Sequence, residues 1–160
     1  MAEIPYISAQ DAVSKIRSGQ HVLVGSGCAE PEILHLLTIG SAPYADPGLQ
    51  GSFRHNAFFI GPNVRAAVRA GAAVYTPVFL HEIPRLIRSG RIHIDAALVQ
   101  VSTPDKAGRM SLGISVDIVR AAVESARLVI AQVNPRMPRT RGESLLPREA
   151  FDLLVPGAAP

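Results

Sequence analysis

The chain has 160 residues, 48% of them hydrophobic, so it is long enough to bury one core and too apolar for extended disorder. Its 16 basic and 13 acidic residues give a formal charge of +3 without a dense basic block, so composition does not demand a nucleic-acid partner. The single cysteine, Cys28, excludes a disulfide framework and a zinc site built from several cysteines. Residues 1–11 lack a signal-peptide pattern and no run of about 18 apolar residues occurs, so we expect a soluble, cytoplasmic protein with no membrane partner.

The first expected elements are a short helix and a buried strand. Ser8 can cap a helix whose apolar residues, among them Ala12 and Ile16, share one face, and Gly19 follows its end. The apolar run at 21–24 then predicts a strand.

The segment 32–39 allows two interpretations. Only six residues, Ser26 to Pro31, separate the first strand from this apolar stretch, whereas a parallel crossover needs about a dozen. The segment is therefore either a helix entered at Pro31 or a strand that is not a normal parallel neighbour of the first.

Strands and helices are expected to alternate along the rest of the chain. Apolar runs suited to burial on both faces of a sheet occur at 96–101 and 128–133, a shorter run at 58–60 precedes a glycine turn, and helices are expected at 64–70, 80–89 and 118–127. Residues 41–52 and 134–147 are predicted loops, and 156–160 resemble a linker or frayed tail. The alternation predicts an α/β fold with a mostly parallel sheet flanked by helices.

Three loops that leave these strands are candidates for ligand binding, at 25–31, 61–63 and 102–109. Carboxyl ends of parallel strands share one sheet edge, so the loops should converge there. A helix beginning after Asn63 would favour an anion such as a carboxylate or thioester oxygen, although Asn63 as a plain helix cap is the simpler role. Glu30 and Asp105 lie in such loops and are candidates for a base or nucleophile.

Cofactor motifs are missing from the sequence. Glu30 stands where the dinucleotide fingerprint needs glycine, and no phosphate-loop motif occurs. The five histidines lack metal-ligand spacing, so we expect no metal and no permanently bound cofactor.

Several ordered motifs resemble the acetyl-CoA hydrolase/transferase family, which includes 4-hydroxybutyrate, succinate and acetate CoA-transferases. The strings that carry the resemblance are 25–31 (GSGCAEP), 53–65 (FRHNAFFIGPNVR), 75–80 (YTPVFL), 100–105 (QVSTPD), 111–117 (SLGISVD) and 132–140 (QVNPRMPRT). The resemblance implies the layered α/β fold of the NagB/RpiA/CoA-transferase type. It also implies an enzyme that moves CoA between an acyl thioester and a small carboxylic acid, or that hydrolyses the thioester.

In that family a glutamate attacks the thioester, and the reaction proceeds through a glutamyl-CoA intermediate. The family places this glutamate in a C-terminal half, so the resemblance implies no catalytic residue in this chain and no activity of the chain alone. The implied substrate is coenzyme A as acyl-CoA, the implied partner is the C-terminal half, and the complete enzyme is expected to be a homodimer. An alternative is a non-catalytic module for CoA or carboxylate that acts beside a separate C-terminal-half chain.

Carried over by position, the resemblance implies loops that shape the acyl and carboxylate pocket. The implied substrate-binding residues are Gly25, Ser26, Gly27, Glu30, Pro31, Gly61, Pro62, Asn63, Ser102, Pro104, Asp105 and Ser111. The resemblance also moves Glu30 from the nucleophile role to a role in loop structure.

One departure from the family concerns the region before residue 33, where related chains place a helix that this sequence lacks. We therefore expect one domain over 1–155 with an internal deletion near 31–32, followed by a truncated linker at 156–160. A lost helix is expected to leave one sheet face exposed.

Overall fold

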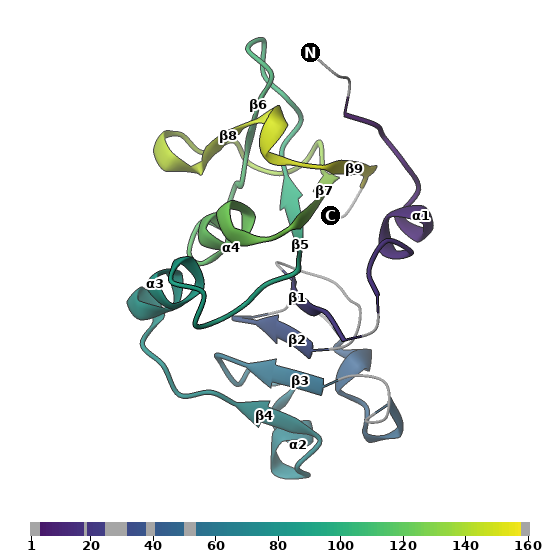
Figure 1. Ribbon diagram of the computed structural model, residues 1–160, viewed down its shortest axis with the longest axis vertical. Helices are drawn as coiled ribbons and strands as arrows, with labels where there is room; N and C mark the ends of the chain where they lie inside the picture. The colour runs from purple at the N-terminus through teal and green to yellow at the C-terminus, as the bar shows by residue number, and fades with distance from the viewer. Residues whose placement is uncertain (1–3, 18, 25–31, 38–40, 50–53, 158–160) are drawn as a thin grey trace.

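The computed structural model describes residues 4–17, 19–24, 32–37, 41–49 and 54–157 (Figure 1). Its centre is a seven-stranded sheet in the order β4-β3-β2-β1-β5-β7-β9. The strands are β1 (His21–Val24), β2 (Glu32–His35), β3 (Arg54–Ala57), β4 (Ala73–Tyr75), β5 (Ala96–Val101), β7 (Leu128–Val133) and β9 (Leu153–Pro156). Every neighbouring pair is parallel, which confirms the predicted α/β class.

In the described ranges, four α-helices accompany the sheet: α1 (Ala9–Val13), α2 (Arg65–Arg69), α3 (Ile83–Arg88) and α4 (Val119–Ser125). The cap of α1 is confirmed, because the Ser8 hydroxyl accepts a hydrogen bond from Asp11 N at 3.1 Å. Short 3-10 turns lie at 43–45, 47–49, 80–82, 142–144 and 148–150, and β6 (Arg109–Ser111) pairs antiparallel with β8 (Leu145–Pro147).

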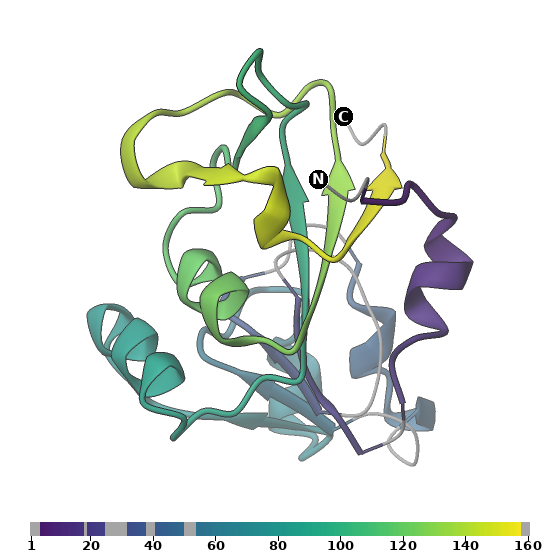
Figure 2. The same ribbon diagram turned by 45° about the horizontal axis from the view of Figure 1, so that its top comes forward.

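Helices cover both faces of the sheet and form two cores. Figures 1 and 2 show α3 and α4 on one side and α1 on the other. Because side chains alternate along a strand, Ala97 and Val99 of β5 join the core under α3 and α4, whereas Leu98 joins the core that includes Ala12 of α1. The strands at 96–101 and 128–133 are thus buried on both faces, as their largely apolar sequences predict.

Residues 32–35 form a strand, and it is a regular parallel neighbour of β1, with His21 opposite Glu32. The expectation that such a strand cannot pair normally with the first is therefore wrong. Both strands have only four residues, so the return path is about 13 Å long. Seven residues, 25–31, join them, and such a length can span more than about 20 Å without a helix.

The face over β1 and β2 is not bare, contrary to the expectation drawn from a lost helix. Val22 and Ile33 are both 0% exposed, and they belong to the same core as Tyr44 of the 43–45 turn. The packing of Tyr44 and its neighbours therefore fills this face in the part of the chain that the structure describes.

Three smaller expectations need correction. The strand before Gly61 is Arg54–Ala57, and the apolar run Phe58 to Ile60 follows it rather than forming it. The predicted loop 134–147 ends in β8. Strand β9 includes Pro156, and Gly157 N donates to Val133 O at 2.9 Å, so the sheet extends into the predicted tail.

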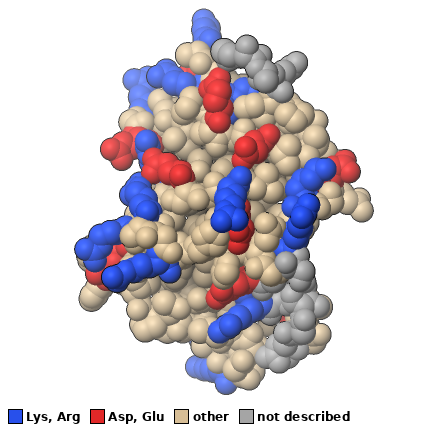
Figure 3. Space-filling model, viewed as in Figure 1, with Lys and Arg blue, Asp and Glu red and all other residues tan. Residues whose placement is uncertain are grey.

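Charges are dispersed over the molecule. Figure 3 shows Lys and Arg interspersed with Asp and Glu on the face seen there. No helix in the described ranges is long and apolar enough to cross a membrane.

Candidate active site at the carboxyl edge of the sheet

Large apolar side chains end or directly follow the short strands β2, β3 and β4. Leu36 and Leu37 follow β2, Phe58 and Phe59 follow β3, and β4 ends at Tyr75. All these strands are parallel, so the segments that follow them meet at one edge, where open α/β sheets bind ligands.

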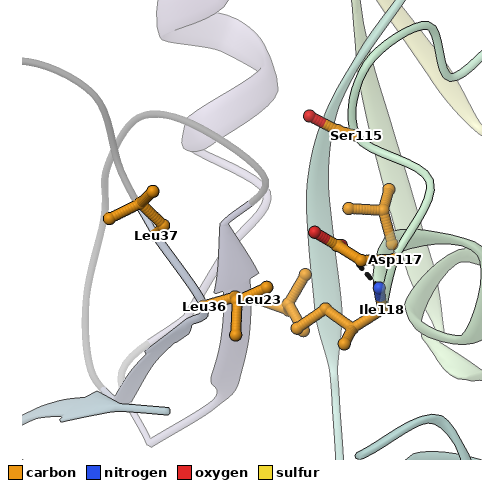
Figure 4. A pocket seen from close by; sticks show the side chains of 7 residues that line it. Leu23, Leu36, Leu37, Ser115, Asp117 and Ile118 are labelled. Carbon is orange, nitrogen blue, oxygen red and sulfur yellow. Dashed lines mark hydrogen bonds between the residues drawn. The ribbon is translucent and has the colours of Figure 1, made fainter. Parts of the chain in front are cut away.

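A small pocket opens at this edge between the ends of β1 and β2 and the start of α4. It holds about 50 Å³ and is lined by Leu23, Leu36, Leu37, Ser115, Asp117, Ile118 and Val119. Figure 4 shows the leucines on one side and Ser115, Asp117 and Ile118 on the other. Asp117 Oδ1 accepts a hydrogen bond from Ile118 N at 2.5 Å, which holds the carboxylate at the mouth of the pocket.

A wider hollow of about 370 Å³ lies beside the pocket and shares Leu36 and Leu37 with it. The other lining residues are Phe58, Phe59, Tyr75, Val78, Phe79, Leu80 and Ile83, so no charged side chain contributes. Five residues here are both large and exposed, and we call them the apolar rim: Leu37, Phe59, Tyr75, Phe79 and Leu80, of which Phe79 is 72% exposed. An apolar surface of this kind on a folded domain marks a ligand groove or an interface.

The predicted site residues in the first loop, Gly25, Ser26, Gly27, Glu30 and Pro31, lie outside the described residues. The second loop does reach the edge, because Gly61 is buried beside Leu37. A Cβ at Gly61 would lie 3.0 Å from Leu37 Cδ1 and 2.9 Å from Asn63 Oδ1, so a larger residue here would have to displace these two side chains.

Asn63 is not the cap of α2, which was its simpler predicted role. Pro62 and Asn63 lie in a turn, and the helix begins two residues later, with Val64 at the N-cap and no side-chain capping bond. The helix has only five residues, so its start supplies little dipole for an anion.

The third predicted loop folds on itself. Ser102 and Ser111 come together across the hairpin, where Ser111 N donates to Ser102 Oγ at 3.0 Å. Ser111 is 0% exposed, and its Oγ accepts hydrogen bonds from Gly113 N and Thr140 N, both at 3.1 Å. These hydroxyls therefore brace the hairpin against residues 139–144, and neither serine lines the two pockets described above.

Asp105 serves the same hairpin, and Pro104 precedes it on the surface. Asp105 Oδ1 accepts a hydrogen bond from Arg109 N at 2.8 Å, and Oδ2 lies 3.1 Å from Arg109 Nε and 3.7 Å from Arg139. The bond from Arg109 N, partly opposed by desolvation and aided by Ala107 N, holds the pKa of Asp105 below its ordinary value. Asp105 is thus a fixed anion that closes a turn, an arrangement poorly suited to a base.

Ser115 and Asp117 are the polar groups that the sequence interpretation missed. In the sequence, this hydroxyl and this carboxylate lie just before the helix expected at 118–127, a position that is equally typical of an ordinary helix start. No group of three His, Cys, Asp or Glu side chains is placed to hold a metal ion within the described ranges.

Comparison with known proteins identifies the family. Residues 32–155 match the acetyl-CoA hydrolase/transferase N-terminal domain. The chain is 40% identical to 4-hydroxybutyrate coenzyme A transferase of Clostridium kluyveri over 171 residues, covering 96% of this chain and 40% of that protein. It is 36% identical to a succinyl-CoA:acetate/propanoyl-CoA:succinate CoA transferase of Fasciola hepatica over 164 residues, covering 91% of this chain and 34% of that protein.

The fold agrees with a solved structure from the same group. The crystal structure of 4-hydroxybutyrate CoA-transferase from Porphyromonas gingivalis superposes with a TM-score of 0.76 at 28% identity, covering 97% of this chain and 40% of that one. The chain thus spans about 40% of the length of these relatives. Together, the match over residues 32–155 and these identities show that the chain belongs to the acetyl-CoA hydrolase/transferase family.

Proposed function

We propose that this chain is the N-terminal half of an acyl-CoA:carboxylate CoA-transferase, with acyl-CoA hydrolysis as the related activity of the same site. The observation that carries the proposal is the uncovered apolar rim, which lies at the sheet edge where α/β folds bind ligands. The chain spans about 40% of the C. kluyveri relative, and the C-terminal half of such an enzyme would cover that rim.

The proposed chemistry needs a nucleophile that the C-terminal half would supply. Its glutamate carboxylate attacks the thioester carbonyl and releases CoA thiolate, leaving a mixed anhydride. The thiolate then attacks the glutamyl carbonyl, which expels the free acid and leaves a glutamyl-CoA thioester. A second carboxylate takes the CoA by the reverse steps, whereas water at this stage would give hydrolysis.

The role of this chain is to shape the pocket and to exclude water from it. The hollow beside Phe58 and Phe59 offers an apolar wall for an acyl group, and Ser115 and Asp117 offer polar atoms beside it. Gly61 to Asn63 would complete that wall through the contact with Leu37, and Gly25 to Pro31 would lie nearby as the exit loop of β1. Ser102, Asp105 and Ser111 would hold the third loop, which includes Pro104, in place, because their polar atoms are hydrogen-bonded to other protein groups.

We also propose that the expected domain over 1–155 has an internal deletion near 31–32, and that any linker starts only after Pro156 and Gly157, which are held in the sheet. Two features support the deletion. The C. kluyveri alignment runs over 171 positions although it takes in 96% of a 160-residue chain, so the relative has positions that this chain lacks. The family match begins at residue 32, directly after the short connection.

Complementation tests the proposal. The chain would be coexpressed with a separate C-terminal half taken from the C. kluyveri relative and assayed for CoA transfer between acyl-CoA and acetate or succinate, with borohydride trapping. We expect no turnover from the chain alone. The pair should show turnover and a trapped glutamate in the C-terminal half.

Two variants test whether the apolar rim carries the association. Phe79→Ser should weaken the pair, whereas Val13→Ser, on an exposed position of α1, should leave it unchanged. Turnover with a trapped glutamate in the chain alone would refute the proposal. A pair that binds CoA but never turns over would instead favour the alternative, a non-catalytic module for CoA or carboxylate.

A further inference from the structure

Two histidines face each other inside the molecule, and neither lines the pockets described above. His35 ends β2 and His55 lies in β3, and both are 1% exposed. Their Nε2 atoms are in direct contact, and their rings stack with centroids 4.5 Å apart at an angle of 20°. Tyr44 packs edge-on against both rings, at 6.0 Å from His35 and 5.2 Å from His55.

The contact fixes how protons are shared in the pair. Two unprotonated Nε2 lone pairs would repel each other, so one ring carries its proton on Nε2 and donates it to the other. Both Nδ1 atoms are buried without a hydrogen-bond partner. A first added proton would therefore sit on an Nδ1 that has no acceptor, and a second would occupy the accepting Nε2 and break the bond.

Among the described residues, no ion pair compensates a positive charge on either ring. The titratable groups that face the rings are the other imidazole and the Tyr44 phenol. Along the sheet, His55 pairs with Ile33 on one side and Ala73 on the other. Within the described ranges neither imidazole forms an ion pair with a carboxylate, unlike His21 and His93, which lie beside Asp95.

Burial sets the direction of the response to acid. Burial is the main reason that the pKa of His35 falls from 6.5 to about 4, and the neighbouring His55 lowers it further. The backbone of Leu36 partly opposes this shift. Burial also lowers the pKa of His55. Between pH 6.5 and about 4 the unfolded chain therefore binds more protons than the folded one, so stability falls as the pH falls through this range.

We propose that the His35–His55 pair is an acid-sensitive clasp between β2 and β3. In its neutral form the pair holds the short-strand end of the sheet together with Tyr44. Protonation separates the two rings and loosens β3 and β4. Phe59 follows β3 and Tyr75 ends β4, so loosening these strands in acid also displaces part of the apolar rim. The device depends only on groups inside this chain and does not require the transferase function.

Thermal unfolding of the purified chain between pH 7 and pH 5 tests the clasp. The double variant His35→Gln/His55→Gln removes both titrating rings, and His81→Gln removes an exposed histidine as the matched control. We expect the unfolding midpoint of the unmodified chain to fall by about 5–10 °C more than that of the double variant over this range. The His81→Gln protein should follow the unmodified chain.

Two further measurements locate the effect. Hydrogen exchange, corrected for the intrinsic pH dependence, should rise at pH 5 in residues 54–75 before it rises in 96–133. Ring-proton titration by NMR, which needs no folded variant, should place the pKa of both buried histidines below the ordinary histidine value of 6.5. Equal midpoint losses in the unmodified chain and the double variant, titration of His35 and His55 at the ordinary value, or uniform exchange across both segments would each overturn the clasp.

Discussion

Removal of the Ser111 hydroxyl provides a direct test of whether this predicted site residue binds a ligand or braces a loop. Ser111 is 0% exposed, and its Oγ is the hydrogen-bond acceptor for Gly113 N and Thr140 N, each at 3.1 Å. In Ser111→Ala both amides lose that acceptor in a region closed to water. Each buried N–H left without a partner costs about 1–3 kcal/mol, so we expect a loss of about 2–4 kcal/mol in the free energy of unfolding.

Urea denaturation at pH 7.5 measures this loss against a matched variant. Ser115→Ala removes the same hydroxyl from a half-buried serine at the small pocket, and we expect its free energy of unfolding to change by less than about 0.5 kcal/mol. A loss of about 3 kcal/mol is a large share of the roughly 5–15 kcal/mol that stabilises a domain. If Ser111→Ala is as stable as Ser115→Ala, the bracing role is wrong and a role in ligand binding regains its support.

Two other substitutions probe the same hairpin. Gly113→Ala should lower the free energy of unfolding, measured by urea denaturation, by at least about 2 kcal/mol, because Gly113 has φ +62° and the new Cβ would lie 2.1 Å from Met137 Sδ. Gly90→Ala is the control, because Gly90 has φ +74° but no atom within 4 Å of its Cβ position. It should show only the smaller cost of the backbone conformation. Asp105→Asn should lower the unfolding midpoint more at pH 6 than at pH 3, because a carboxyl whose pKa is lowered, chiefly by Arg109 N, stabilises the fold fully above its ordinary pKa and loses that contribution as the pH falls through its lowered pKa. An unchanged difference between pH 6 and pH 3 would contradict this assignment.

Strands buried on both faces were predictable from sequence because their residues are almost all apolar. The runs 96–101 and 128–133 match β5 and β7 to the residue, and only Gln100 and Gln132, which hydrogen-bond to each other, interrupt their apolar pattern. Strand β3, Arg54–Ala57, gave no such signal, because three of its four residues are polar, and His55 and Asn56 find their partners or their burial only in the folded structure. The apolar run after it, Phe58 to Ile60, belongs to the edge and was mistaken for the strand.

The site was predictable as a place and less so as a set of residues. Parallel strands put their exits on one edge, so loop positions followed from topology. Whether a hydroxyl in those loops faces a ligand or the protein depends on contacts distant in sequence. Ser111 meets Thr140, 29 residues away, and no local pattern contains that information. Ser115 and Asp117 line the pocket for the same reason, because β2 brings Leu36 and Leu37 against them.

The two halves of the sheet differ in how firmly their strands are held, and this difference bears on function. Strands β5 and β7 share six paired residues, whereas β3 and β4 share only three. Fewer ladder bonds mean that the β2–β4 half depends more on side-chain packing, including the stacked histidines and Tyr44. The apolar rim lies on that same half, so a partner that covers the rim would stabilise the weaker part of the sheet by mass action. We therefore expect complementation to raise hydrogen-exchange protection most strongly in residues 54–75. Equal protection throughout the sheet would show that the partner binds elsewhere.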